Sequence, residues 1–181
     1  MLDRPHPQSQ TMDFPANRRS LRHALRACAL ALPLLSIAAG GCSKTYIPNT
    51  DVEDSGDNRH IVGFCETYRR AVEERDVDTL VKMASTRYFE TGGNANSRDD
   101  IDYNGLRAYL TSKFKLTKAI RYEIRYRRIS EGEGKVVNVD FTYTASFEIP
   151  TAEGDVWNRA VRDNRLQLVR DGESFKILGG M

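Results

Sequence analysis

Few side chains in this sequence have a type and spacing that could do chemistry, and the best candidates are Tyr68 and Glu90. Tyr68 lies on the apolar side of a predicted helix, and Glu90 ends a predicted short strand from Arg87 to Glu90. If both reached one cavity, the phenol could donate a hydrogen bond and the carboxylate could accept a proton. Two such groups are not yet a catalytic constellation. Core packing is the simpler explanation of Tyr68, because buried tyrosines commonly bond a neighbour through the hydroxyl.

Other kinds of site have no basis in the sequence. There is no Cys/His cluster, phosphate-binding glycine-rich loop or nucleophile elbow, and His60 alone cannot build a metal site. The loop Thr91 to Asp100 is rich in Gly, Asn and Asp and could offer oxygen ligands to Ca²⁺. Its spacing matches no calcium-binding loop, however, and the neighbouring Asp102 is better explained as a helix cap. We therefore predict no metal and no cofactor.

Three helices should precede the sheet. The first starts near Asp57 or Asn58, either of which could cap it, and a second, shorter helix follows the cap Asp76. A third begins after Asp102. In the first helix, apolar residues recur at helical spacing while charged residues fill the other face. These apolar residues are Ile61, Phe64, Cys65, Tyr68, Ala71 and Val72.

From Ala119 the apolar period changes from 3.6 to 2, which indicates antiparallel strands with one buried face. A two-residue turn at Gly132 would place Tyr126 opposite Val139 and would pair Arg125 with Asp140 on the polar face.

The next predicted strand runs from Asp155 to Arg170 and carries conflicting signals. Trp157 marks odd positions as buried, whereas Leu166 and Leu168 mark even ones, so we predict a β-bulge within residues 162–165. A turn at Asp171-Gly172 would then pair Leu168 with Phe175 in the last strand.

This element order, together with the run Tyr68-Arg-Arg-Ala-Val-Glu-Glu-Arg-Asp76-Val-Asp-Thr-Leu80, resembles the nuclear transport factor 2-like (cystatin-like) superfamily over about residues 58–181. That superfamily includes ketosteroid isomerase and polyketide cyclases. The resemblance implies an α+β cone, with three N-terminal helices packed on a curved antiparallel sheet of four long strands plus one short strand. It says little about activity, because one fold hosts many chemistries.

The resemblance also implies where a site would lie. In this superfamily the sheet curls over the helices and can leave an apolar pocket at one end. Tyr68 stands where ketosteroid isomerase has the tyrosine of its oxyanion hole, but the position of its general base is Gly92 here, and Glu90 lies two residues earlier with the same strand parity. The oxyanion-hole acid has no counterpart, because Asp140 falls on the polar strand face. The residues expected to line the pocket are Tyr68, Tyr88, Tyr122, Phe141, Tyr143 and Trp157.

Residues 1–41 are predicted to be an export signal. Within residues 17–42, four arginines precede an apolar run from Ala27 to Ala39 that is too short to span a membrane comfortably. The sequence Ala39-Gly40-Gly41-Cys42 resembles the lipobox of bacterial lipoproteins, in which the cysteine is lipidated and becomes the new N-terminus; a plain cleavage site is the alternative. Residues 42–57 would form a lipidated flexible tether, and residues 58–181 the folded domain.

These features predict a location. Cys28 leaves with the signal and Cys65 is expected in the core, so no disulfide is expected. Ser43 after the cysteine resembles the enterobacterial signal for the periplasmic face of the outer membrane. Arg18-Arg19 resembles a twin-arginine signal, with ordinary secretion as the alternative. Five arginines and two aspartates precede Cys42, which leaves 22 basic and 23 acidic side chains, so nucleic acid is not an expected partner.

Three functions fit these observations. The favoured one is a non-catalytic envelope lipoprotein, anchored to the membrane through lipid on Cys42, whose cone binds a partner protein or a small apolar ligand. The second is an isomerase- or cyclase-like enzyme that uses Tyr68 and Glu90. The third is a structural subunit of an envelope complex, or a homodimer, that pairs through the outer sheet face. The residues on that face are Arg121, Arg125, Arg127 and Thr142.

Overall fold

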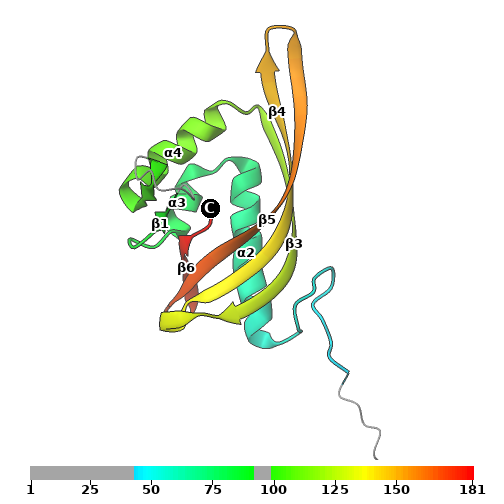
Figure 1. Cartoon of the computed structure of the whole chain (residues 1–181), viewed down its shortest axis with the longest axis vertical. Coiled ribbons are helices and arrows are strands. Elements are labelled where there is room, and N and C mark those ends of the chain that lie inside the picture. The colour runs from blue at the N-terminus through cyan, green and yellow to red at the C-terminus, as the bar shows by residue number, and fades with distance from the viewer. Residues whose placement is uncertain (1–42, 92–98) are drawn as a thin grey trace, which may run out of the picture. The chain divides into compact units, whose positions relative to one another are not determined.

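Three helices cover one face of a curved antiparallel sheet in the computed structural model of the chain (Figure 1). The structure describes residues 43–91 and 99–181. Residues 44–181 form one compact unit. The predicted signal peptide, the lipidation site Cys42 and most of the loop Thr91 to Asp100 lie outside the described residues, so the predictions made for them stay predictions.

The helices begin at side-chain caps. Helix α2 spans Gly56–Glu74, α3 spans Val77–Met83 and α4 spans Tyr103–Lys115. Asp76 accepts a hydrogen bond from Thr79 N at 3.0 Å, and Asp102 accepts one from Gly105 N at 2.8 Å, so both predicted caps are confirmed. The cap of α2 is Ser55 rather than Asp57 or Asn58, because the helix starts one turn earlier than its apolar stripe.

The main sheet has the order β3-β4-β5-β6, with every neighbouring pair antiparallel. Its strands are β3 (Ala119–Glu131), β4 (Val137–Thr151), β5 (Gly154–Asp171) and β6 (Ser174–Gly179). The expected α+β class, with three helices on a four-stranded sheet, is therefore confirmed. The predicted short strand is β1 (Phe89–Glu90), which pairs with a second short strand that the sequence did not indicate, β2 (Ile101–Asp102).

Both predicted hairpin registers are wrong by two residues. Tyr126 lies opposite Phe141 rather than Val139. The 3₁₀ turn over Glu133–Lys135 lengthens the connection, so that Glu131 pairs with Val137, and the irregularity between Tyr126 and Arg128 then reduces the shift by one residue. Leu168 lies opposite Ile177 rather than Phe175, because the loop is one residue further along, at Gly172. A shift of two preserves the strand parity, so the predicted faces of β3 and β4 remain correct.

The predicted bulge within residues 162–165 is also wrong. Strand β5 pairs with β4 in one continuous register, and the irregularities lie between Tyr126 and Arg128 and between Gln167 and Leu168. Even positions of β5 therefore face inward along the strand. Trp157 and Val161 lie on the outer face and are 45% and 57% exposed.

Asp140 binds partners other than the predicted Arg125. It accepts hydrogen bonds from Arg165 Nε at 2.6 Å and from Arg128 Nη2 at 2.9 Å. These contacts, Arg165 first, hold the pKa of the Asp140 carboxyl below its ordinary value. Arg125 and Arg127 instead bind Asp51.

We expect Asp140→Asn to lower the free energy of unfolding at pH 7 by about 1 kcal/mol, because two guanidinium groups lose their shared carboxylate. A carboxyl with a lowered folded-state pKa stabilises the protein above its ordinary pKa, and that contribution disappears as the pH falls through the folded-state value. The difference between wild type and variant in urea unfolding should therefore shrink below about pH 4. A difference independent of pH would show that packing rather than charge is lost.

The segment before α2 is part of the fold. Tyr46 and Glu53 form a bridge, Val52 is buried, and Asp51 N donates to Tyr126 O at 2.9 Å. The predicted flexible tether over residues 42–57 is therefore wrong for residues 46–57. Val52 packs into the core, which the polar residues around it in the sequence did not indicate. Within the described residues, no helix has the length and apolar character needed to cross a membrane.

Candidate functional site

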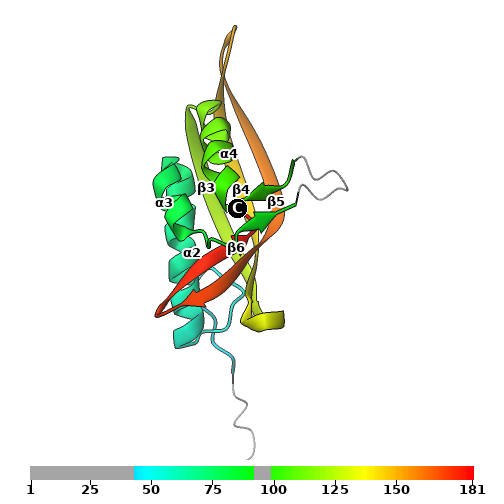
Figure 2. The ribbon, with the colours of Figure 1, turned by 90° about the vertical axis from the view of Figure 1, so that its left-hand side faces the viewer.

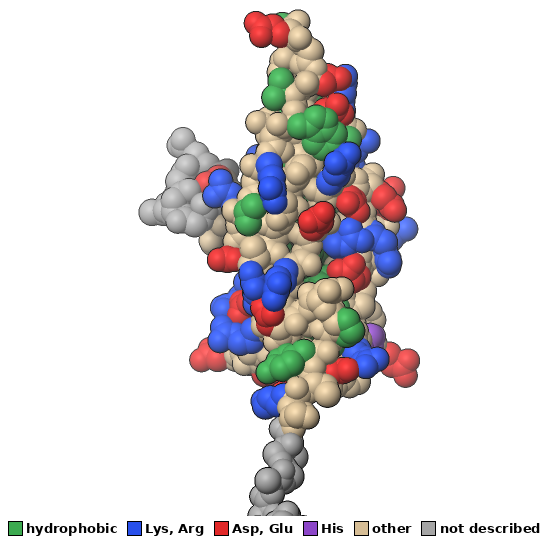
Figure 3. All heavy atoms as spheres, turned by 90° about the vertical axis from the view of Figure 1, so that its right-hand side faces the viewer, with side chains coloured by type: hydrophobic (Ala, Val, Ile, Leu, Met, Phe, Trp, Pro, Cys, Tyr) green, Lys and Arg blue, Asp and Glu red, His purple; other side chains and the backbone are tan. Residues whose placement is uncertain are grey.

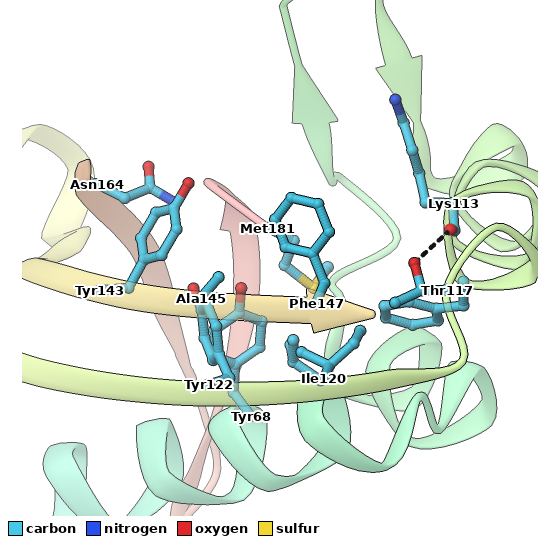
Figure 4. A pocket seen from close by; sticks show the side chains of 12 residues that line it. Tyr68, Lys113, Thr117, Ile120, Tyr122, Tyr143, Ala145, Phe147, Asn164 and Met181 are labelled. Atoms are coloured by element: carbon cyan, nitrogen blue, oxygen red, sulfur yellow. Dashed lines mark hydrogen bonds between the residues drawn. The ribbon is translucent and has the colours of Figure 1, made fainter. Parts of the chain in front are cut away.

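A pocket of about 370 Å³ opens between the helices and the inner face of the sheet (Figure 4). Helix α2 contributes Tyr68 from its apolar stripe, and the inner positions of β3 and β4 contribute Tyr122 and Tyr143. The end of α4 closes the side opposite Tyr143. The pocket is lined by Tyr68, Val72, Lys113, Phe114, Thr117, Ile120, Tyr122, Tyr143, Ala145, Phe147, Asn164 and Met181.

A smaller cavity of about 160 Å³ adjoins this pocket. It shares Tyr68, Val72, Lys113, Phe114 and Met181 with the pocket and is completed by Leu80, Tyr109 and Leu110. The shared residues form the wall between the two spaces. Most of this wall is apolar, so an apolar molecule in the pocket would contact hydrocarbon and aromatic surface.

Three tyrosines are among the polar residues that line the pocket, together with Lys113, Thr117 and Asn164. The rings of Tyr68 and Tyr122 meet edge to face with centroids 6.3 Å apart, and the Tyr122 and Tyr143 centroids are 5.3 Å apart. Burial raises the pKa of Tyr68 well above 10, and the hydrogen bond to Tyr122 raises it further. Burial likewise raises the pKa of Tyr122. Both phenols are therefore neutral near pH 7. One of their two O–H donors is used in the hydrogen bond between them, which leaves one O–H that can donate to a ligand.

Glu90 does not join Tyr68 in the pocket. Its carboxylate accepts a hydrogen bond from Gly180 N, and Glu90 is not among the lining residues. Gly180 has φ +92°, and a Cβ there would lie 1.9 Å from Arg165 O. Glu90 thus holds the tightly folded C-terminal turn. The structure does not support the predicted pairing of Tyr68 with Glu90, since the Glu90 carboxylate binds the C-terminal turn instead of lining the pocket.

Of the other residues expected to line the pocket, two do so and three lie elsewhere. Tyr122 and Tyr143 line it, as predicted. Phe141 is 1% exposed and belongs to the closed core, and Tyr88 is buried near Glu90 and Met181. Trp157 is wrong as a lining residue, because it lies on the outer face under the Arg121 guanidinium, 5.0 Å from the ring centroid.

The sequence did not indicate several lining residues. Phe114 follows Leu106 and Leu110 at helical spacing in α4, so its inward position could have been found from that pattern. Lys113, Asn164 and Met181 carry no such signal. Asn164 Nδ2 donates to Gly180 O at 3.0 Å, which keeps the C-terminal turn and Met181 at the pocket.

The side chains that line the pocket are apolar, hydroxyl, amide or ammonium groups. No side-chain carboxylate or imidazole, which are common general bases, is among its twelve lining residues. In the parts of the chain that the structure describes, no three His, Cys, Asp or Glu side chains are grouped as a metal site would require.

No family model and no curated protein matches this sequence. The fold, in contrast, is similar to that of solved structures. A proposed dehydratase of the nuclear transport factor 2-like family from Streptomyces avermitilis has a TM-score of 0.58 at 12% identity, over 68% of this chain and 93% of that one.

Two proteins from Novosphingobium aromaticivorans are similar at the same level. A proposed scytalone dehydratase has a TM-score of 0.58 at 10% identity, over 68% of this chain and 80% of its own. A proposed aromatic ring hydroxylase has a TM-score of 0.53 at 14% identity, over 68% of this chain and 85% of its own. At this identity the likeness shows the fold alone, so the chain has the nuclear transport factor 2-like fold.

Proposed function

We propose that this domain binds a small, mainly apolar ligand in the pocket between its helices and its sheet. The observation that carries the proposal is the lining of that pocket, which combines an apolar wall with tyrosine hydroxyls and has no side-chain base. The neutral phenols of Tyr68 and Tyr122 bond each other, and the remaining O–H donor of this pair can orient a ligand by hydrogen bonding. A pocket of about 370 Å³ is within the size range of small-molecule sites.

N-phenyl-1-naphthylamine, a neutral fluorescent apolar molecule, tests this proposal. We expect its emission to rise on titration with the protein and to saturate at one molecule per chain. Emission that increases without saturation, or that is unchanged, would contradict a defined ligand site. Thermal unfolding with and without the probe gives an independent check, because a ligand of the folded state raises Tm.

An isomerase- or dehydratase-like activity is the second candidate. It is favoured by the buried Tyr68 and Tyr122 hydroxyls, which could stabilise a developing oxyanion, and by the fold of the proposed dehydratases. A base would have to come from outside the lining residues. Glu90 could supply it only by leaving Gly180 N.

The outer face of the sheet offers less support for a structural subunit or a homodimer. Figure 3 shows its hydrophobic side chains scattered among charged ones rather than joined in one patch. On this face of β5, Arg159 lies between the exposed Trp157 and Val161, and Asp163 follows Val161. Pairing through this face would leave such charges to be matched by the partner.

We also propose that a lipid on Cys42 anchors the domain to a bacterial membrane. Because the compact unit begins at Lys44, Ser43 alone would separate it from the lipidated residue, and the domain would be held close to the membrane surface. Mass spectrometry of the mature protein from its native host should find a diacylglyceryl group on Cys42. Cys42→Ala should move the protein from the membrane fraction to the soluble one. An unmodified mature N-terminus would exclude the anchor.

A further inference from the structure

Lys113 is a cation at the edge of an apolar pocket. It lies in the last turn of α4, lines both the pocket and the adjoining cavity, and is exposed. Its ammonium lies 5.3 Å from the centroid of the Tyr109 ring. Within the described residues it forms no ion pair, whereas Lys118 binds Asp155 and Arg107 binds Asp78. Lys113 is therefore available to a ligand.

The surroundings of Lys113 contain no competing negative side chain. None of the residues that line the two cavities is an aspartate or a glutamate. A negative group on a ligand would meet the positive charge of Lys113 and no acidic side chain, next to apolar walls that strengthen the attraction relative to open water. The α-carboxylate of Met181, which lines both cavities, is the negative group against which this attraction has to be weighed.

The shape of the pocket places an apolar group beside this charge. Figure 4 shows Lys113 and Thr117 on one side of the pocket and Tyr143 and Asn164 on the other, with Phe147 between them. Phe114 and Ile120 complete the apolar wall near Lys113. The Lys113 side chain runs along the rim, and its ammonium points away from the other labelled side chains (Figure 4). A molecule with its apolar part between these walls would therefore meet the ammonium at the rim of the pocket.

We propose that the ligand is an amphipathic monoanion, an apolar molecule whose single negative group binds Lys113. This inference rests on the proposed ligand-binding function and adds the chemical class. Lysine offers a compact point charge rather than the two-pronged donor of arginine, which suits one anionic group of varied geometry. The apolar part of the ligand supplies most of the affinity, and its anionic group makes it bind more tightly than a neutral ligand of the same shape.

Two related fluorophores test the charge separately from the apolar part. 1-Anilinonaphthalene-8-sulfonate has the ring system of N-phenyl-1-naphthylamine plus one sulfonate. We expect Lys113→Gln to weaken binding of the sulfonate about fivefold at low salt and to change binding of the neutral amine by less than about twofold. Lys115→Gln is the matched control, because Lys115 is exposed in the same turn of α4 but lines neither cavity.

The outcomes separate this inference from the proposed function. If neither fluorophore binds the wild type, the ligand-binding function itself is overturned. If the neutral amine binds but Lys113→Gln leaves the sulfonate unaffected, or Lys115→Gln weakens it equally, the preference for an anion at Lys113 is overturned. The inference is supported if affinity is lost only for the sulfonate and only in Lys113→Gln, and if this loss becomes smaller when salt is added. Circular dichroism confirms that the exposed substitutions leave the fold intact.

Discussion

Tryptophan at position 145 should close the pocket. Ala145 faces inward from β4 and lines the pocket beside Tyr143 and Phe147. We expect Ala145→Trp to weaken binding of N-phenyl-1-naphthylamine by roughly 10- to 100-fold, because a ligand would have to displace an indole whose burial is worth about 1.5–3 kcal/mol. The measurement is fluorescence titration of wild type and variant.

Ser146→Trp is the matched control for this substitution. Ser146 is the next residue of β4 and faces the opposite side of the sheet, opposite Arg121 and Arg159. The same indole there should leave the affinity for the probe within about twofold, as expected of a surface substitution away from the site. Equal binding by wild type and Ala145→Trp would show that the probe binds elsewhere and would refute the assigned pocket.

Phe141 and Trp157 should differ sharply in their effect on stability, although the sequence predicted both as pocket aromatics. Phe141 is 1% exposed and its ring lies between those of Tyr126 and Tyr143, with centroids 6.5 and 6.3 Å away. We expect Phe141→Ala to lower the free energy of unfolding by about 3–5 kcal/mol, since it leaves a cavity in the core. Urea unfolding followed by circular dichroism measures this change.

We expect Trp157→Ala to lower the free energy of unfolding by less than about 1 kcal/mol. The indole is 45% exposed, and its described ring contact is with the Arg121 guanidinium, an exposed cation–π pair. A loss from Trp157→Ala comparable to that from Phe141→Ala would mean that the outer face of β5 is covered in solution. In that case a Tm that depends on protein concentration would indicate that two copies pair through the sheet. The structural-subunit function would then be favoured.

The placement of the C-terminal turn explains why the candidate chemistry was only partly predictable. Tyr68 was found because its helical spacing puts it on the buried side of α2. Glu90 has the parity and position for a base, but its carboxylate binds Gly180 N, a residue 90 positions away. No local pattern contains that contact. Glu90 of β1 and Asn164 of β5 both bond Gly180, next to the C-terminus marked in Figure 2.

The edge of the sheet shows a similar limit. Glu73 accepts a hydrogen bond from Tyr122 N at 3.1 Å, and Arg69 donates to Tyr122 O at 3.1 Å, so side chains of α2 satisfy the free edge of β3. In the sequence these two residues are only the charged side of an amphipathic helix. Their role depends on how closely α2 approaches the sheet, which the helical pattern does not specify.

The sequence alone determined the class of fold, the helix caps Asp76 and Asp102, and the inward faces of β3 and β4. These follow from local periods of 3.6 and 2 and from short-range hydrogen bonds. Only the tertiary structure decided the strand registers, because a slip of two residues preserves every face. It also decided that Trp157 lies outside, that Glu90 holds the C-terminus, and that Lys113 borders the pocket. Those positions depend on the curvature of the sheet and on contacts between distant segments, which no local period encodes.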